Sequence, residues 1–270
     1  MSRILRAFEL ARREDRAAFV PFLMAGDPDL AATRGMVLAL AAAGADVVEL
    51  GVPFSDPIAD GPVNQAAATR ALAAGTDLKS ILIEIGEIRQ RTPIPLVLFT
   101  YYNPVHAYGL ERFAEQAAAS GLDGVLCVDL PVEEAEGDYL DALRGHGLDA
   151  VFLLAPTSTR RRVRQVVRRG SGFVYYVSRT GVTGERTALP EQLEREVLAL
   201  RGALDKPLAV GFGISTPEQA AAVARIADGV VVGSALVRLV ERHGREPDLP
   251  ARIGRAAAEL AAACRRTKPG

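Results

Sequence analysis

One acidic side chain lies inside a strongly apolar segment of the chain. Glu49 follows Val47 and Val48 and precedes Leu50. Burying an ionised carboxylate is costly unless a partner or a reaction uses the charge. We therefore interpret Glu49 as a general acid or base. The alternative is a structural glutamate that is hydrogen-bonded to a partner in the protein interior.

The segment that follows Glu49 holds two more carboxylates. Asp56 and Asp60 lie between prolines at positions 53, 57 and 62. Aspartate is a common turn former in such segments, so the residues alone leave Asp60 open between a turn and a function. If Asp60 lies near Glu49, the two carboxylates could exchange protons with a substrate.

Two glycine-rich turns could bind an anion. Gly211 and Gly213 follow one apolar run, and Gly233 and Ser234 follow the next. Glycine lets backbone N–H groups approach a ligand, and a helix N-terminus offers unpaired donors. These turns predict a phosphate site, whereas the alternative is that the glycines merely end strands. The Gly211-x-Gly213 pair lacks the third glycine of a dinucleotide motif.

A long polar loop with two glycines, residues 178–186, follows the apolar run 173–177. Its length is typical of a lid that closes over a ligand. Tyr175 and Tyr176 precede the loop, and strand alternation turns only one of them inward. We expect an inward tyrosine to line the site, and a core aromatic is the alternative.

Several kinds of chemistry lack the residues that they need. Lysine occurs only as Lys79, Lys206 and Lys268, and none of them ends a predicted strand. This argues against Schiff-base and pyridoxal phosphate (PLP) chemistry. The three histidines are scattered and the two cysteines are isolated, so we expect no metal site. Proton transfer by carboxylates remains.

The composition is that of an ordinary globular enzyme. Hydrophobic residues make up 49% of the 270 residues, the net charge is -1, and we expect no nucleic-acid or membrane partner. No apolar stretch reaches the roughly 18 residues of a membrane span. Isolated cysteines and the lack of a signal peptide favour the cytoplasm. The arginine-rich segment 160–169 predicts a solvated helix face.

The elements that must position these residues alternate regularly. Short β-branched runs predict strands, and the segments between them carry apolar residues at helical spacing. The predicted strands are 18–25, 46–50, 96–100, 124–128, 150–154, 173–177, 208–211 and 229–232. Eight such pairs predict one (β/α)8 TIM barrel over residues 1–270, with an extra N-terminal helix and a helical tail over about 247–270. An open α/β sheet is the alternative.

These motifs together resemble one family. The chain is similar from end to end to the α subunit of tryptophan synthase. The similarity is carried by residues 21–28 (PFLMAGDP), 49–62 (ELGVPFSDPIADGP), 101–104 (YYNP), 178–184 (SRTGVTG) and 211–215 (GFGIS). The second and fourth of these segments are highly specific to that family.

The resemblance implies a carbon–carbon lyase of tryptophan biosynthesis. Its reaction is the retro-aldol cleavage of indole-3-glycerol phosphate to indole and glyceraldehyde 3-phosphate. Glu49 would be the acid and base, Asp60 would accept the indole N–H, and Tyr175 would complete the catalytic set. The implied substrate-binding residues are Phe22, Thr100 and Phe212 around the indole, and Thr183, Gly184, Gly213, Gly233 and Ser234 toward the phosphate.

The resemblance also implies a partner. A PLP-bearing β subunit would receive indole through a tunnel in an α2β2 heterotetramer, so this chain would need neither cofactor nor metal. Loops 53–62 and 178–190 would close over the substrate. Three alternatives are a stand-alone indole lyase, a noncatalytic regulatory subunit and a phosphosugar isomerase. The presence of both Glu49 and Asp60 speaks against the last two.

Overall fold

The computed structural model describes residues 1–177, 191–211 and 213–266. Its strands are all parallel to their neighbours. They are β1 (Ala18–Met24), β2 (Val48–Gly51), β3 (Leu96–Thr100), β4 (Gly124–Cys127), β5 (Asp149–Ala150), β6 (Phe152–Leu154), β7 (Val174–Val177), β8 (Leu208–Gly211) and β9 (Gly229–Val232). Each predicted strand is therefore found to within two residues at either end.

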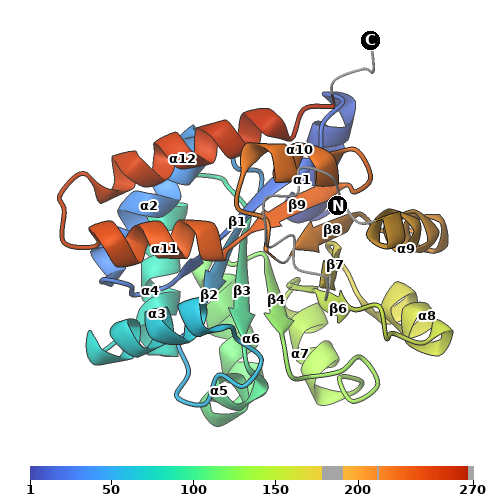
Figure 1. Ribbon diagram of the computed structural model, residues 1–270. Helices are drawn as coiled ribbons and strands as arrows, with labels where there is room; N and C mark the ends of the chain where they lie inside the picture. The colour runs from blue at the N-terminus through green and yellow to red at the C-terminus, as the bar shows by residue number, and fades with distance from the viewer. Residues whose placement is uncertain (178–190, 212, 267–270) are drawn as a thin grey trace.

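Helices surround these strands (Figure 1). They are α1 (Arg3–Arg13), α2 (Leu30–Ala42), α3 (Pro62–Ala73), α4 (Leu78–Arg89), α5 (Tyr102–Tyr108), α6 (Leu110–Ser120), α7 (Asp138–Gly145), α8 (Arg160–Arg169), α9 (Glu191–Ala203), α10 (Pro217–Ala224), α11 (Ser234–His243) and α12 (Leu249–Ala263). The predicted helical tail corresponds to α12, which packs on α2 and buries Ile253 and Ala257.

The strand order shows how the sheet curls round. It runs β5-β4-β3-β2-β1-β9-β8-β7-β6, so its two ends are β5 and β6. These are the two halves of the predicted strand 150–154, interrupted only at Val151, whose N–H donates to the carbonyl of Val125 at 2.9 Å. Because the two ends are consecutive pieces of one segment, the sheet is nearly closed. This confirms the barrel and makes the open-sheet alternative wrong.

Alternation along the strands separates two cores. Outward residues such as Val48 and Leu50 pack under the helices, whereas inward residues such as Val20, Val97 and Val231 fill the barrel. Each fully buried aliphatic side chain stabilises the fold by about 1.5–3 kcal/mol.

The predicted N-terminal helix is α1, and it covers one end of the barrel. Its residues Ile4, Phe8 and Ala11 belong to the inner core, and the rings of Phe8 and Phe173 lie 5.3 Å apart. Each strand begins at this end, as shown by Asp46, which precedes β2 and holds Arg16 at 2.6 and 2.8 Å. The loops that follow the strands therefore gather at the opposite end, where barrels carry their active sites.

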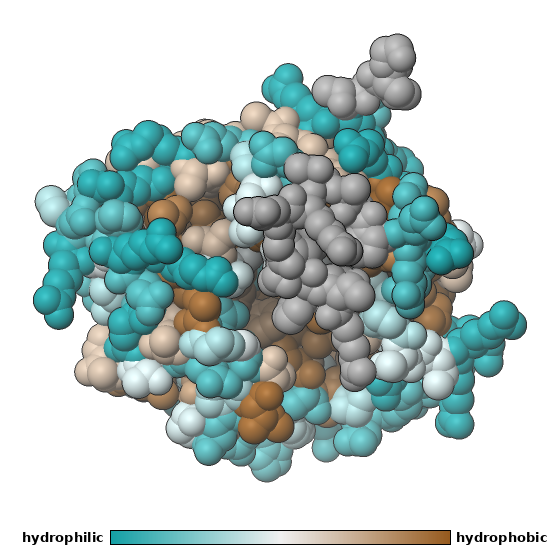
Figure 2. Space-filling view, viewed as in Figure 1, coloured by the Kyte–Doolittle hydropathy of each residue, from teal (hydrophilic) through white to brown (hydrophobic). Residues whose placement is uncertain are grey.

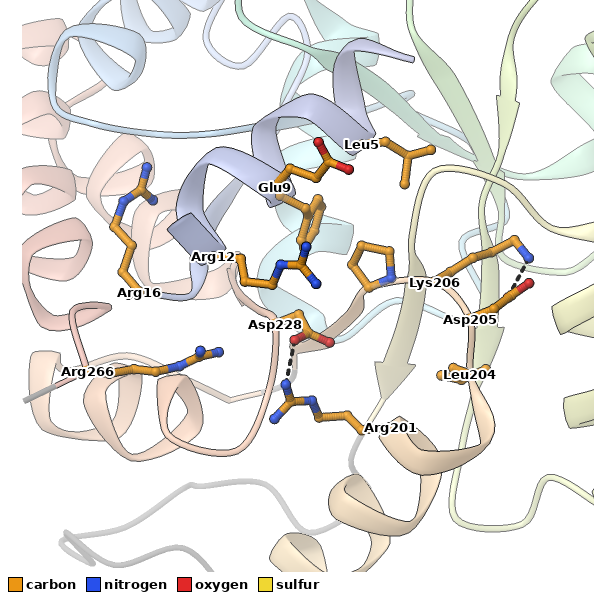
Figure 3. A pocket seen from close by; sticks show the side chains of 12 residues that line it. Leu5, Glu9, Arg12, Arg16, Arg201, Leu204, Asp205, Lys206, Asp228 and Arg266 are labelled. Carbon is orange, nitrogen blue, oxygen red and sulfur yellow. Dashed lines mark hydrogen bonds and ion pairs between the residues drawn. The ribbon is translucent and has the colours of Figure 1, made fainter. Parts of the chain in front are cut away.

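A cavity of about 320 Å³ also lies at the α1 end, between α1, the end of α9 and the segments that lead into β8 and β9 (Figure 3). Two ion pairs lie in its lining, Arg201 with Asp228 and Lys206 with Asp205, each at 2.8 Å. The cavity is thus far along the strands from the loop that carries Asp60, and it is not the candidate active site.

The arginine-rich segment forms α8 at the surface. Arg160, Arg161, Arg164 and Arg168 are exposed, as predicted for a solvated face. Hydrophilic side chains project from this edge of the molecule in Figure 2, where Figure 1 places α8 and α9. Two other arginines of the segment have partners instead, since Arg162 and Arg169 form ion pairs with Glu133 and Glu136 of the segment before α7.

Candidate active site

Glu49 points into the barrel. In β2 it lies opposite Phe22 of β1 and Val97 of β3. Its neighbours Val48 and Leu50 belong to the outer core, so alternation turns Glu49 inward. Its side chain is fully buried, with 0% of its surface exposed.

The Glu49 carboxyl has no partner that would stabilise its charge. Neither carboxyl oxygen makes a hydrogen bond to any of the residues that the structure describes. Burial alone raises the pKa of Glu49 from 4.5 to about 8. At neutral pH the group therefore holds a proton that it can donate. The structural alternative, a glutamate hydrogen-bonded to an interior partner, finds no such partner among these residues.

Asp60 lies in the loop between β2 and α3, and its carboxylate is directed by β3. Oδ2 accepts a hydrogen bond of 3.0 Å from the hydroxyl of Tyr101, the residue after β3. Burial raises the pKa of Asp60, while hydrogen bonds from Tyr101 and Asn64 oppose that rise. The backbone of Asp60 does make a turn, with its N–H bonded to Pro57 O at 3.0 Å. The side-chain carboxylate, however, takes no part in this turn and binds instead to Tyr101, which is distant in sequence.

The structure distinguishes the two neighbouring tyrosines. Tyr176 points outward and donates to Glu196 at 2.6 Å. Tyr175 packs against the inner core, and its pKa lies well above the ordinary value because of burial and, second, the negative charge of Glu49. Tyr175 thus lies beside Glu49, as the sequence analysis expects of the inward tyrosine.

Aromatic rings line the barrel next to these groups. Phe99 of β3 lies edge-on to Phe22, with ring centroids 5.3 Å apart, and 6.5 Å from Tyr175. Phe22 itself is 4% exposed. These rings form a flat-sided apolar surface of the kind that would pack against an aromatic substrate.

Thr100 does not lie on this inner surface. It shares the outward face of β3 with Leu96 and Leu98, and its hydroxyl donates to the carbonyl of Tyr101 at 3.0 Å. The prediction that Thr100 lines the indole pocket is therefore corrected to Phe99. Alternation from the inward Val97 was the signal in the sequence that could have found Phe99.

Two glycines are required by close approach of these aromatic side chains. A Cβ on Gly211 would lie 2.4 Å from the Tyr175 hydroxyl, and one on Gly51 would lie 2.6 Å from the Phe22 ring. Both distances are too short for a real contact, so only glycine leaves room. Because Gly211 and Gly51 have no Cβ, the side chains of Tyr175 and Phe22 can occupy these positions in the site.

The glycine corner adjoins the same surface. Gly213 has φ 76°, which favours glycine, and Gly233 precedes α11, whose first residue is Ser234. No side chain of the described residues caps this helix start, which suits its first backbone N–H groups to an anion. A Cβ on Gly233 would lie 3.5 Å from Phe22, which places the corner next to the aromatic rings. Three other predicted site residues, Thr183, Gly184 and Phe212, lie outside the described residues, as does the predicted lid 178–190.

The described residues contain neither a metal-binding cluster nor a membrane-spanning helix. No three histidine, cysteine, aspartate or glutamate side chains gather there in a way that could hold a metal ion. Among the same residues, no helix is both long and apolar enough to cross a membrane.

Comparison with known proteins decides the family. Residues 8–265 match the family model described as tryptophan synthase alpha chain. The chain belongs to the tryptophan synthase alpha chain family. It is 53% identical over 265 residues to the tryptophan synthase alpha chain of Geobacter sulfurreducens, covering 98% of each chain. The predicted family is confirmed.

Solved structures agree with this family assignment. The tryptophan synthase subunit alpha of Legionella pneumophila superposes with a TM-score of 0.90 at 36% identity, covering 98% of each chain. A chain of tryptophan synthase from M. tuberculosis in its aminoacrylate-bound form gives a TM-score of 0.87 at 35% identity, over 98% of this chain and all of that one. As a member of the tryptophan synthase alpha chain family, the protein is a lyase that cleaves indole-3-glycerol phosphate in tryptophan biosynthesis.

Proposed function

We propose that Glu49 carries out both proton transfers of the cleavage and that Asp60 stabilises the charge that develops on the indole ring. The observation that carries this proposal is the buried Glu49 carboxyl on the inner face of the barrel, which has no hydrogen-bond partner among the described residues. A carboxyl held near pKa 8 can act first as an acid and then as a base at neutral pH.

The proposed first step is protonation of the indole ring. Protonated Glu49 donates its proton to C3 of indole-3-glycerol phosphate, which leaves a positive charge shared with the ring nitrogen. The Asp60 carboxylate accepts the N–H hydrogen bond, which strengthens as that charge develops. Glu49 is left as an unpaired carboxylate in an apolar environment, where it is a strong base.

The proposed second step breaks the carbon–carbon bond. The Glu49 carboxylate removes the proton of the hydroxyl on the glycerol carbon bonded to C3. The O–H electrons form the aldehyde C=O, the bond to C3 breaks, and its electrons restore the neutral indole ring. Glyceraldehyde 3-phosphate and indole are the products, and Glu49 has recovered its proton, so the cycle closes.

The remaining site residues would bind and orient the substrate. Phe22 and Phe99 would pack against the indole, and Phe212 belongs to the same predicted pocket. Tyr175, kept neutral by its raised pKa, would remain a hydrogen-bond donor beside Glu49. Gly213, Gly233 and Ser234, together with Thr183 and Gly184, would hold the phosphate.

We also propose the assembly that the resemblance implies, an α2β2 complex with a PLP-bearing β subunit, while this chain works without a cofactor. The loop that carries Asp60 supports such a partner, because its Ile58 leaves 87% of its surface exposed. A contact there would act on the position of Asp60 two residues away. A single domain over residues 1–270 and a cytoplasmic location stay predictions.

An indole-release assay tests the proposed function. The purified chain is given indole-3-glycerol phosphate with and without a tryptophan synthase β subunit, and because the chain contains no tryptophan, its own fluorescence does not mask indole. We expect slow release alone and faster release with the partner. No release in either case would favour a noncatalytic regulatory subunit, and equal rates would favour a stand-alone lyase.

A further inference from the structure

The Tyr101 hydroxyl joins two consecutive residues of the Asp60 loop. It accepts a hydrogen bond of 2.9 Å from the backbone N–H of Ala59 and donates one of 3.0 Å to Oδ2 of Asp60. Tyr101 follows the last residue of β3 and is 3% exposed. The contact therefore spans 41 residues of sequence. It links the Asp60 loop to the end of strand β3, and loops are in general more mobile than strands.

The geometry leaves the phenol one orientation. A tyrosine hydroxyl has a single proton to donate, and the Ala59 N–H occupies one of its acceptor positions. The proton is therefore directed at Asp60, where it favours a carboxylate over a protonated carboxyl. The Tyr101 hydroxyl thus binds Asp60 through Oδ2.

The ring that carries this hydroxyl is held in place. Phe54, from the same loop as Asp60, packs on Tyr101 with ring centroids 5.1 Å apart. Asn64 of α3 supplies a second hydrogen bond to Asp60, and Gln65 bonds the Asp60 carbonyl at 2.8 Å. Asp60 forms no ion pair with any described residue, so these neutral groups alone set its orientation there.

We infer that Tyr101 is a positioning residue for the reaction: it fixes the Asp60 carboxylate, and the loop around it, in the orientation that receives the indole N–H. This inference rests on the proposed role of Asp60. Tyr101 would act through Asp60 when positive charge develops on the indole ring, so its loss should lower kcat more than it changes KM.

Removal of the hydroxyl also changes proton binding at Asp60. The Tyr101 hydrogen bond lowers the pKa of Asp60 against the larger effect of burial, which raises it. Without that bond the pKa of Asp60 is higher still, so a larger fraction of Asp60 is protonated at a given acidic pH. The acid limb of the rate profile therefore moves to higher pH, while the limb that belongs to Glu49 does not move.

The test is Tyr101→Phe, assayed by indole release from indole-3-glycerol phosphate by the full chain together with the β subunit. We expect kcat to fall by about 10-fold to 100-fold, the range for loss of a hydrogen bond to a charged group, with KM changed less than about 3-fold. The matched control is Tyr102→Phe, because the Tyr102 ring packs against Tyr139 and His106, away from Asp60. It should keep wild-type kcat and the wild-type acid limb.

A double-mutant cycle with Asp60→Asn separates positioning from a merely structural role. In that background, Tyr101→Phe should cost less than about 2-fold in kcat, since there is no carboxylate left to orient. An undiminished cost there, or a Tyr101→Phe variant with wild-type kcat and acid limb, would overturn the inference. Near-normal activity of Asp60→Asn alone would instead show that the proposed role of Asp60 is wrong. Matching thermal midpoints of all variants confirm that folding is retained.

Discussion

The buried Glu49 carboxyl should make the protein less stable as pH rises. The pKa of Glu49 is about 8 in the folded protein, compared with 4.5 in an exposed glutamate. Between these two values the folded state keeps a proton that the unfolded chain has released. The contribution of this group to stability is therefore fully present below about pH 4.5, declines through that window and is lost above about pH 8. Glu49→Gln removes the titration and should remove the decline.

The size of the effect follows from the same two values. Each pH unit of the window corresponds to about 1.4 kcal/mol, so the rise of the pKa from 4.5 to about 8 sets an upper bound of about 5 kcal/mol. Any water that reaches the carboxylate reduces it, and we expect a change of about 2–5 kcal/mol. Because whole domains are stable by only about 5–15 kcal/mol, a change of this size is easily measured.

Urea unfolding between about pH 5 and pH 9 provides the measurement. The free energy of unfolding of Glu49→Gln, minus that of the wild type, should increase steadily toward high pH. The control is Glu115→Gln, which removes an exposed carboxylate from α6 and should follow the wild type in parallel. If Glu49→Gln also runs parallel to the wild type, the Glu49 carboxyl is hydrated or paired, and its use as an acid at neutral pH loses its physical basis.

Three further predictions concern the reaction. Glu49→Gln should abolish nearly all indole release while substrate still binds. In the wild type, kcat/KM should fall as pH rises past about 8, because the protonated form of Glu49 acts first. A rise of kcat/KM in that range would reverse the proposed order of proton transfers. Gly211→Ala should lower kcat/KM by about 10-fold or more by displacing the Tyr175 hydroxyl, whereas Gly86→Ala, with open space around it, should not. Ile58→Ser should leave indole release by the isolated chain unchanged but reduce the acceleration of release by the β subunit. The control Ile83→Ser, at another exposed isoleucine, should change neither rate. Loss of the basal rate in Ile58→Ser would show that Ile58 acts within the chain.

Local patterns were sufficient for the elements of the barrel. Strands and helices differ in the spacing of the apolar residues that face the core, and this spacing can be recognised within a short stretch of sequence. The inward direction of Glu49 follows from the same rule, because Val47, the inward residue just before β2, lies two positions before Glu49. In β3 the same rule points to Phe99 as the inward residue, whereas the family resemblance implies Thr100.

The sequence predicts closure of the sheet only in part. Eight runs predicted a barrel, but the interruption at Val151 and the pairing of β5 with β4 and of β6 with β7 depend on how distant strands meet. Such pairings join residues far apart in the chain, and a single sequence carries no direct signal of them.

What the sequence determined by itself is the set of chemical groups and the elements that carry them: a glutamate inside an apolar strand, an aspartate in the next loop, glycines after β8 and β9, and the motifs of the family. The tertiary structure decided how those groups behave. Glu49 holds its proton at neutral pH because strands from distant segments bury it and, among the described residues, provide no hydrogen-bond partner. The Asp60 carboxylate is bonded by the hydroxyl of Tyr101, 41 residues away in the sequence. Both properties depend on distances between segments, and those distances exist only once the barrel has closed.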